Sequence, residues 1–291
     1  MHTVRAKGIL SASNGMNIYR GCQHGCIYCD ARSNCYQMNH KFEDIEVKEN
    51  APELLEYALK RKRSKCIIGT GAMSDPYIPI ESKLKLTRKC LEIIDHYGFG
   101  ATVQTKSSRV MRDIDLFKSI NDKSKAVLQM TLTTVDENLC KIIEPNVSST
   151  KERFETLKAF HEYGIPSVVW FSPFLPFIND TKENIDGLLK YCIDAKIHGI
   201  ICFDIGLTLR DGDREYFYNQ LDKHFPNMKE RYIHTYGNSY QLQSKNSAVL
   251  MRRISDVCRK HGIMFSVDNV FSYLHQFESK TKQLSLFEKI Q

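Results

Sequence analysis

Three cysteines stand within eight residues near the start of the chain, at Cys22, Cys26 and Cys29. Their spacing, C-x3-C-x2-C, is typical of thiolates that ligate a soft metal rather than pack in a core. Three thiolates are one too few for a cubane iron–sulfur cluster, which has four irons. One iron is then open to a small molecule that can bind and react there. Gly21 and Gly25 flank the turns of this loop and predict positive φ angles.

A zinc knuckle is the alternative interpretation of the triplet, with His24 or Cys35 as a distant fourth ligand. Zinc sites usually pair their cysteines as two C-x2-C units, so the cluster is favoured. The remaining cysteines form no C-x2-C pair, which argues against a second cluster. They are Cys35, Cys66, Cys90, Cys140, Cys192, Cys202 and Cys258.

With Tyr28 before its last cysteine, the triplet resembles the signature of the radical S-adenosylmethionine (SAM) enzymes. In that family the open iron chelates SAM, and an electron from the reduced cluster cleaves SAM to a 5′-deoxyadenosyl radical, which abstracts hydrogen from a substrate. The resemblance implies a [4Fe-4S] cluster on Cys22, Cys26 and Cys29, SAM as second cofactor, and Tyr28 near its adenine. It also implies an external electron donor, flavodoxin or ferredoxin.

Six apolar segments alternate with helical patterns and predict strands at 15–19, 66–70, 100–105, 125–133, 166–171 and 199–204. Such alternation predicts parallel βαβ units. Six units are too few for a closed eight-stranded barrel. The predicted fold is therefore α/β, a partial (β/α)6 TIM-like barrel, which the resemblance also implies. The cysteines follow the first strand, at the end where such barrels carry their chemistry.

Apolar periodicity predicts helices at about 52–63, 84–97, 110–120, 136–143, 150–163 and 181–196. After about residue 207 the pattern weakens, and helices are predicted at about 212–223 and 246–260. We expect a radical SAM partial-barrel domain over 1–206 and a C-terminal helical and strand extension over 207–291, packed on the barrel and ending in a loose tail.

Several strand-end segments are similar, in order, to the spore photoproduct lyase branch of the radical SAM enzymes. They are 74–81, 105–107, 111–113, 144–145 with Arg153, and 171–179. The likeness implies that Lys106 reaches the SAM carboxylate, that the Thr131 hydroxyl lies against SAM, and that the backbone of Gly69, Thr70 and Gly71 meets the SAM amino group. A solvated lysine and an ordinary strand threonine are the alternatives. Asp75 and Glu81 either orient substrate or form surface pairs, and Glu144 and Arg153 either pair structurally or contact SAM.

The chain departs from that branch at Ala72, where the lyase has a cysteine that returns a hydrogen atom to the product. Cys35, Cys66 and Tyr77 are candidate hydrogen donors in its place, and a thymine-dimer lyase reaction is in doubt. We expect a radical SAM enzyme that acts on DNA, by lesion repair or base modification, with lyase and transferase reactions both open. The alternatives are action on RNA, a peptide or a small molecule, or a zinc-binding nucleic-acid module without catalysis.

The net charge of +7 is compatible with an anionic partner without being diagnostic of one. No run of 18 apolar residues and no signal peptide is evident, so a cytoplasmic location without membrane contact is expected.

Near the end, Gln283, Leu284, Leu286 and Phe287 belong to a segment that resembles the QLxLF peptide with which bacterial repair proteins dock on the sliding clamp. The alternative is that these apolar residues pack the tail onto the barrel.

Overall fold

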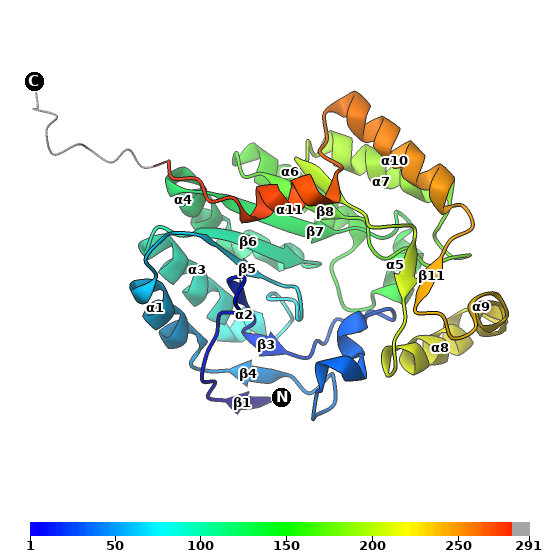
Figure 1. Cartoon of the computed structure of the whole chain (residues 1–291), viewed down its shortest axis with the longest axis horizontal. Coiled ribbons are helices and arrows are strands. Elements are labelled where there is room, and N and C mark those ends of the chain that lie inside the picture. Colours follow the sequence, from blue (N-terminus) through cyan, green and yellow to red (C-terminus); the bar gives the residue numbers. More distant parts are fainter. Residues whose placement is uncertain (281–291) are drawn as a thin grey trace, which may run out of the picture.

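Six parallel strands form the central sheet of the computed structural model, which describes residues 1–280 (Figure 1). They are β2 (Gly15–Met16), β5 (Ile67–Thr70), β6 (Gly100–Thr105), β7 (Ala126–Thr131), β8 (Ser167–Trp170) and β9 (Gly199–Ile201). Their order in the sheet is their order in the chain, and every neighbouring pair is parallel. All their carboxyl ends therefore meet at one edge, and the predicted parallel α/β sheet is confirmed.

Helices connect successive strands. They are α1 (Ala51–Arg61), α2 (Glu81–Leu84), α3 (Leu86–His96), α4 (Ile114–Lys123), α5 (Glu137–Ile143), α6 (Thr150–Glu162) and α7 (Lys182–Asp194). The predicted helix at 84–97 is in fact divided at Lys85, which adopts a left-handed conformation with φ 53°. The buried Glu81 carboxylate stabilises this break because it accepts hydrogen bonds from the backbone amides of Leu86 and Thr87. The segment predicted to begin a helix at 110 starts instead as a 3-10 turn over Ser108–Asp113.

The predicted first strand at 15–19 is wrong in its second half. β2 ends at Met16, and β3 (Tyr19–Arg20) belongs to a separate sheet with β4 (Glu46–Lys48) and β1 (His2–Val4). Tyr19 leaves the central sheet because its backbone pairs with Val47 and its hydroxyl donates to the buried Glu81 carboxylate. The cysteine loop therefore starts from the small N-terminal sheet rather than from the central one.

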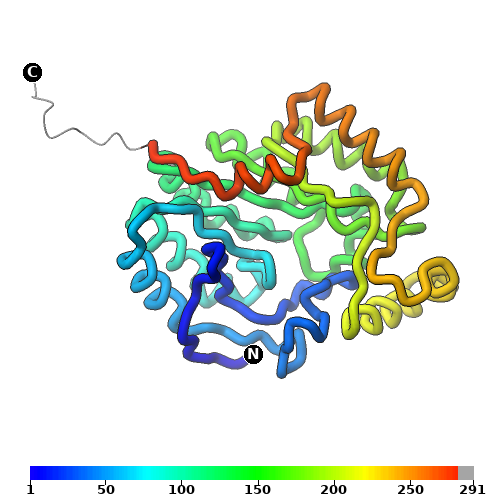
Figure 2. The backbone as a smooth tube through the Cα atoms, in the orientation of Figure 1, coloured from blue at the N-terminus to red at the C-terminus, as the bar shows by residue number. Residues whose placement is uncertain are grey.

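The chain after β9 adds a ribbon and four helices that lie around the sheet (Figure 1). The ribbon pairs β10 (Gly206–Thr208) with β11 (Gln241–Gln243), and the helices are α8 (Asp213–His224), α9 (Met228–Tyr236), α10 (Ser247–His261) and α11 (Val267–His275). The ribbon, α9 and α11 were not predicted. Figure 2 shows the blue segment after β3 reaching the yellow-green segment of α8, where the 3-10 turn Asp30–Arg32 contacts that helix.

Within residues 1–280, no helix has both the length and the apolar character needed to cross a bilayer. The predicted clamp-binding segment with Gln283, Leu284, Leu286 and Phe287 lies outside the described residues. The division into 1–206 and 207–291 stays a prediction.

A buried ion pair anchors the cysteine loop to the sheet. Arg153 donates to the Glu144 carboxylate at 2.6 Å, and both side chains are fully buried. Arg153 also donates to the carbonyl of Thr131 at 2.7 Å, at the end of β7, while Glu144 accepts from the Tyr28 hydroxyl. Burial on its own would raise the pKa of Glu144, but the neighbouring Arg153 and Lys106 cations and the Tyr28 hydroxyl hold it below its ordinary value. Glu144 is therefore ionised, and its pairing with Arg153 is structural.

Replacing Arg153 with Met should lower the free energy of unfolding by about 3–5 kcal/mol, because the Glu144 carboxylate would stay buried without its partner. The double variant Arg153→Met with Glu144→Leu should have a higher free energy of unfolding than Arg153→Met alone, because it removes both charges. Urea denaturation at pH 7 measures these differences. Lys158→Met is the control, since it removes an exposed ion pair with Glu155 from the same helix and should cost under about 1 kcal/mol. Equal losses in Arg153→Met and Lys158→Met would contradict the anchoring role.

Candidate functional site

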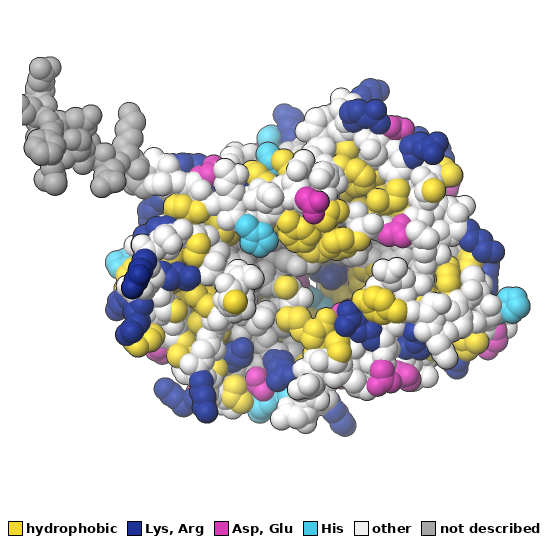
Figure 3. All heavy atoms as spheres, in the orientation of Figure 1, with side chains coloured by type: hydrophobic (Ala, Val, Ile, Leu, Met, Phe, Trp, Pro, Cys, Tyr) yellow, Lys and Arg dark blue, Asp and Glu magenta, His cyan; other side chains and the backbone are white. Residues whose placement is uncertain are grey.

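A cavity of about 600 Å³ opens at the carboxyl ends of the central strands. Figure 3 shows the face on which the molecule is hollowed, with hydrophobic side chains gathered beside the hollow. The cysteine loop forms one wall, and the ends of β6, β7 and β8 form the floor. The ribbon forms the opposite wall with residues 206–208 and 240–243. The extension therefore builds part of the site rather than only covering the barrel.

The three cysteines of the loop, Cys22, Cys26 and Cys29, all line this cavity. The backbone fixes the loop on both sides, because the Cys22 amide donates to the Phe42 carbonyl at 3.0 Å and the Ile27 amide donates to the Ile143 carbonyl at 3.0 Å. The sulfurs therefore reach one cavity from a loop held between the N-terminal sheet and the end of α5.

The predicted positive φ angles of the loop are confirmed at Gly21 (+86°) and Gly25 (+73°). At Gly21 a Cβ atom would lie 2.4 Å from the Phe42 carbonyl oxygen. That distance is shorter than any ordinary contact, so only glycine fits where the loop passes the segment before β4.

The thiols lie in surroundings that favour their protonated form. Burial raises the pKa of Cys22 to about 12 and raises the pKa of Cys26 well above its ordinary value. Burial also raises the pKa of Cys29, although the nearby Lys106 ammonium opposes this shift at both Cys26 and Cys29. Metal ligation uses thiolates, so it has to displace these protons. Lys106 is the cation that favours the thiolate form.

The positions of the two suggested fourth zinc ligands bear on the zinc alternative. Zinc holds thiolates at about 2.3 Å, which places the sulfurs roughly 3.8 Å apart. Within residues 1–280, the three thiols do not form a group of ligand atoms that all lie within 4.8 Å of one another. Neither suggested fourth zinc ligand joins them, because His24 faces the Asp75 carboxylate at 3.4 Å and Cys35 is exposed beside Arg210. The structure therefore brings neither suggested fourth zinc ligand to the three thiols.

Asp75 connects the elements around the cavity. Its carboxylate accepts hydrogen bonds from the Lys106 amide and the Thr105 hydroxyl, each at 2.7 Å, and from the Tyr77 amide at 2.8 Å. It also faces His24 in the cysteine loop. Asp75 therefore ties the segment after β5 to the end of β6 and to the cysteine loop. It also lines the cavity and is not a surface pair.

Lys106 directly follows β6 on the floor of the cavity, half-buried, with its ammonium 5.8 Å from the centre of the Tyr28 ring. Burial on its own would lower the pKa of Lys106, but the surrounding Cys26, Glu144, Cys29 and Asp75 raise it above its ordinary value. Lys106 is therefore a cation facing the cavity, which is the property that the binding of a carboxylate requires.

Of the other residues predicted to meet SAM, some line the cavity and some do not. Tyr28, Thr131 and Gly71 line the cavity with Lys106. Gly69 and Thr70 lie within β5 and are not among the lining residues, because they pair with both neighbouring strands of the sheet. The backbone that meets the cavity after β5 is instead that of residues 71–75.

None of the three candidate hydrogen donors lines the cavity. Tyr77 is fully buried and donates to Asp113 at 2.9 Å. Cys66 immediately precedes β5, at the end of the strand opposite the cavity, and Cys35 is exposed. Ala72 is in the cavity wall. Among residues 1–280, the cavity therefore contains no cysteine beyond the three of the loop.

Sequence reasoning missed two groups of lining residues. Trp170 ends β8 and Phe203 follows β9, and Tyr240 to Gln243 come from β11 and the residue before it. Trp170 is the one tryptophan of the chain and lies near the end of a predicted strand, which is a signal that could have identified it. The ribbon residues carry no such signal. Glu81 proved to be structural, because it is buried and pairs with Arg112 at 2.7 Å.

Sequence comparisons agree with this architecture. The profile of the radical SAM superfamily matches residues 16–192, more than half of the chain. An uncharacterised protein of Methanocaldococcus jannaschii is 38% identical over 169 residues, 57% of this chain and 62% of that protein. An uncharacterised protein of Mycobacterium tuberculosis is 26% identical over 259 residues, 84% of this chain and 74% of that protein. The match thus spans less than two thirds of the M. jannaschii protein.

Solved structures show a similar fold. A spore photoproduct lyase mutant with a dinucleoside spore photoproduct aligns with a TM-score of 0.66 over 90% of this chain and 80% of that chain, at 14% identity. The lyase complexed with the same kind of dinucleoside aligns with a TM-score of 0.60 over 85% and 74% of the two chains. These likenesses confirm the barrel-like α/β fold. With the superfamily profile covering more than half of its length, the chain belongs to the radical SAM superfamily, whose members use a [4Fe-4S] cluster and SAM.

Proposed function

We propose that Cys22, Cys26 and Cys29 hold a [4Fe-4S] cluster in the cavity, that SAM binds beside it, and that the enzyme acts on DNA by lesion repair or base modification. The observation that carries the first part is that the three thiols and the Lys106 ammonium line one cavity at the carboxyl ends of parallel strands. When bound, the cluster and SAM supply a 5′-deoxyadenosyl radical.

In this proposal four residues contact SAM. The Lys106 ammonium binds its carboxylate, and the Thr131 hydroxyl lies against it. The Tyr28 ring packs near the adenine, fixed by the hydrogen bond from its hydroxyl to Glu144. The backbone at Gly71 lies beside the amino group. An external electron donor, flavodoxin or ferredoxin, reduces the cluster.

The DNA assignment is supported by an aromatic rim beside the cavity, formed by Trp170, Phe203, Phe271 and Tyr240. The Phe203 and Phe271 rings stack with centroids 6.2 Å apart, and Trp170 lies 6.0 Å from each of them. Phe203 is 59% exposed and Tyr240 is 45% exposed, and both line the cavity. Exposed flat rings suit stacking against nucleobases, and the net charge of +7 suits a polyanion. The dinucleoside bound by the structurally similar lyase agrees with this substrate class.

The identity of the substrate is tested by anaerobic incubation with SAM, a reductant and deuterated DNA or RNA. Deuterium transfer from DNA into 5′-deoxyadenosine supports the proposal. Deuterium transfer from RNA alone would establish RNA as the substrate class, and transfer from neither would favour a peptide or a small molecule. A thymine-dimer lyase reaction is not proposed, because the cavity wall has Ala72 where the lyase branch has a cysteine.

Clamp docking through Gln283, Leu284, Leu286 and Phe287 stays a prediction, and it would bring the enzyme to DNA.

Replacing Cys29 with Ala should remove the cluster and abolish SAM cleavage, because only two thiolates would remain. Iron and acid-labile sulfide in anaerobically purified protein measure the cluster, and 5′-deoxyadenosine measures cleavage. Cys258→Ala is the matched control, since Cys258 is buried in α10 away from the cavity and should leave both unchanged. Full SAM cleavage by Cys29→Ala, or colourless wild-type protein with stoichiometric zinc, would refute the ligand assignment.

Replacing Lys106 with Ala should weaken SAM binding by about 1–3 kcal/mol, the scale of a charged hydrogen bond lost from a partly buried site. Iron content should stay the same, because the side chain is not a ligand. Anaerobic calorimetric titration measures the affinity. The exposed Lys118→Ala serves as the control. An unchanged SAM affinity in Lys106→Ala would remove Lys106 from the SAM site.

Replacing Phe203 with Ala should weaken binding of single-stranded DNA by about 1–3 kcal/mol, the contribution of one base stacked on an aromatic ring. Fluorescence anisotropy at a fixed salt concentration measures it. Tyr163→Ala is the control, because Tyr163 is 50% exposed but follows α6, outside the cavity wall. Equal affinities of the two variants would show that the aromatic rim does not contact DNA.

A further inference from the structure

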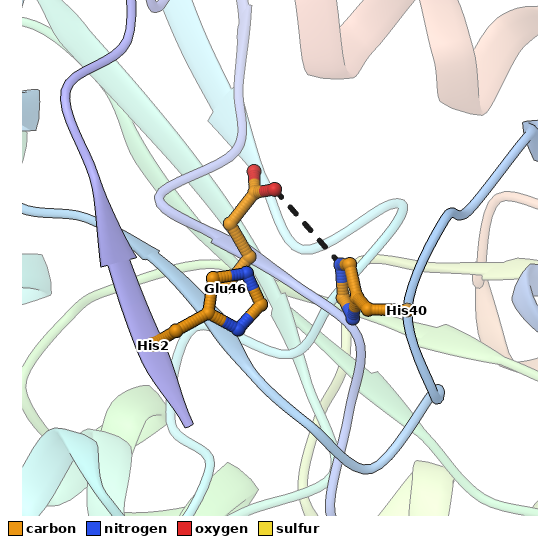
Figure 4. A group of neighbouring side chains, drawn as sticks. All are labelled: His2, His40 and Glu46. Atoms are coloured by element: carbon orange, nitrogen blue, oxygen red, sulfur yellow. Dashed lines mark ion pairs between the residues drawn. The ribbon is translucent and has the colours of Figure 1, made fainter.

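A second group of metal-ligating side chains lies outside the cavity, on the N-terminal sheet (Figure 4). His2 is on β1, Glu46 is on β4, and His40 is in the segment that leads into β4. One ligand atom from each of the three lies within 4.8 Å of the others. The sheet fixes two of them side by side, because His2 and Glu46 are direct partners in the parallel pairing of β1 with β4.

The hydrogen bonds of the two histidines suit metal ligation. Nδ1 of His2 lies 3.0 Å from a carboxylate oxygen of Asp44, and Nδ1 of His40 lies 3.0 Å from the carbonyl oxygen of Lys41. A ring that donates its Nδ1 proton to an oxygen keeps the lone pair on Nε2. Metal-ligating histidines are typically oriented in this way, by a carboxylate or a backbone carbonyl behind the ring.

His40 supplies a separate observation. Its side chain is 11% exposed, and its Nε2 atom is buried without a hydrogen-bond partner. The Glu46 carboxylate oxygen faces this atom at 3.9 Å, which is too long for a hydrogen bond. A buried nitrogen that has no hydrogen bond and faces a carboxylate at this distance is costly unless something binds between the two groups. A cation between the two atoms satisfies both.

We propose that His2, His40 and Glu46 bind a divalent transition-metal ion such as Zn²⁺. Two imidazoles and one carboxylate form a donor set that such ions favour. Ligands at about 2.0–2.2 Å from zinc lie roughly 3.3–3.5 Å apart, so the three side chains close on an ion by shifts of about 1 Å. His2 is 39% exposed, which leaves room for water as a fourth ligand.

The site has a structural consequence for the cysteine loop. Glu46 pairs with Arg20 between β4 and β3, two residues before Cys22, and the segment between His40 and Glu46 contains the Phe42 carbonyl that accepts from the Cys22 amide. An ion on His2, His40 and Glu46 therefore fixes β1 and this segment against the loop. None of the three ligands lines the cavity, so the ion stabilises the fold and takes no part in the reaction.

Zinc binding to the anaerobic, cluster-containing protein with an untagged N-terminus tests the proposal. After dialysis against Zn²⁺, elemental analysis should find about one zinc per chain in addition to the iron. Zinc-edge X-ray absorption should show only nitrogen and oxygen ligands at about 2.0–2.2 Å. His40→Gln and Glu46→Gln should each weaken zinc binding at least tenfold, whereas the exposed His234→Gln in α9 should not.

Stability provides an independent measurement. Zinc should raise the melting temperature of the wild-type protein, because it binds only the folded chain. Zinc should not raise the melting temperature of Glu46→Gln. This variant keeps the size of the side chain, so it can replace His40→Gln in the test if His40→Gln fails to fold. Three outcomes would overturn the proposal. The wild-type protein could take up no zinc during dialysis, the bound zinc could have sulfur ligands at about 2.3 Å, or Glu46→Gln and His234→Gln could bind zinc equally well.

Discussion

The structure depends on two buried carboxylates that hold an irregular loop against a regular sheet. Glu144 binds the Tyr28 hydroxyl within the loop, and Asp75 faces His24. Each carboxylate is also tied to a strand end, Glu144 through Arg153 to the carbonyl of Thr131 and Asp75 directly to the amide of Lys106. These bonds act together with the packing of Cys26, Ile27 and Tyr28 in a core cluster that contains Ile143, and both hold the thiols in position.

The cavity has two chemically different sides. Thiols, the Lys106 ammonium and the Thr131 hydroxyl occupy the side formed by the cysteine loop and the strand ends, where a cluster and a charged cofactor belong. Exposed aromatic rings and the ribbon occupy the other side. The family's cofactors account for the first side.

Most of the central sheet could be predicted because its strands from β5 onward lie in apolar runs, whereas β2 has only two residues and its predicted extent of 15–19 was wrong. The meeting of Cys22, Cys26 and Cys29 at one cavity could be predicted because their spacing is local, and their role as cluster ligands stays a prediction. The division of the helix at Lys85 could not be predicted, since no sequence pattern indicates a left-handed lysine. The ribbon could not be predicted either, because its strands have three residues each and are separated by more than thirty residues. Tyr77, Cys35 and Cys66 were proposed as donors from residue type alone, and residue type does not tell which way a side chain points.

The central claim is that three cysteines leave one iron open for SAM. Electron paramagnetic resonance of the dithionite-reduced protein, recorded before and after addition of SAM, tests it most directly. The account predicts a [4Fe-4S]⁺ signal whose g values change when SAM is added, because SAM binds the iron itself. A cluster signal that SAM leaves unchanged, or a cluster that persists when Cys29 is replaced, would contradict it.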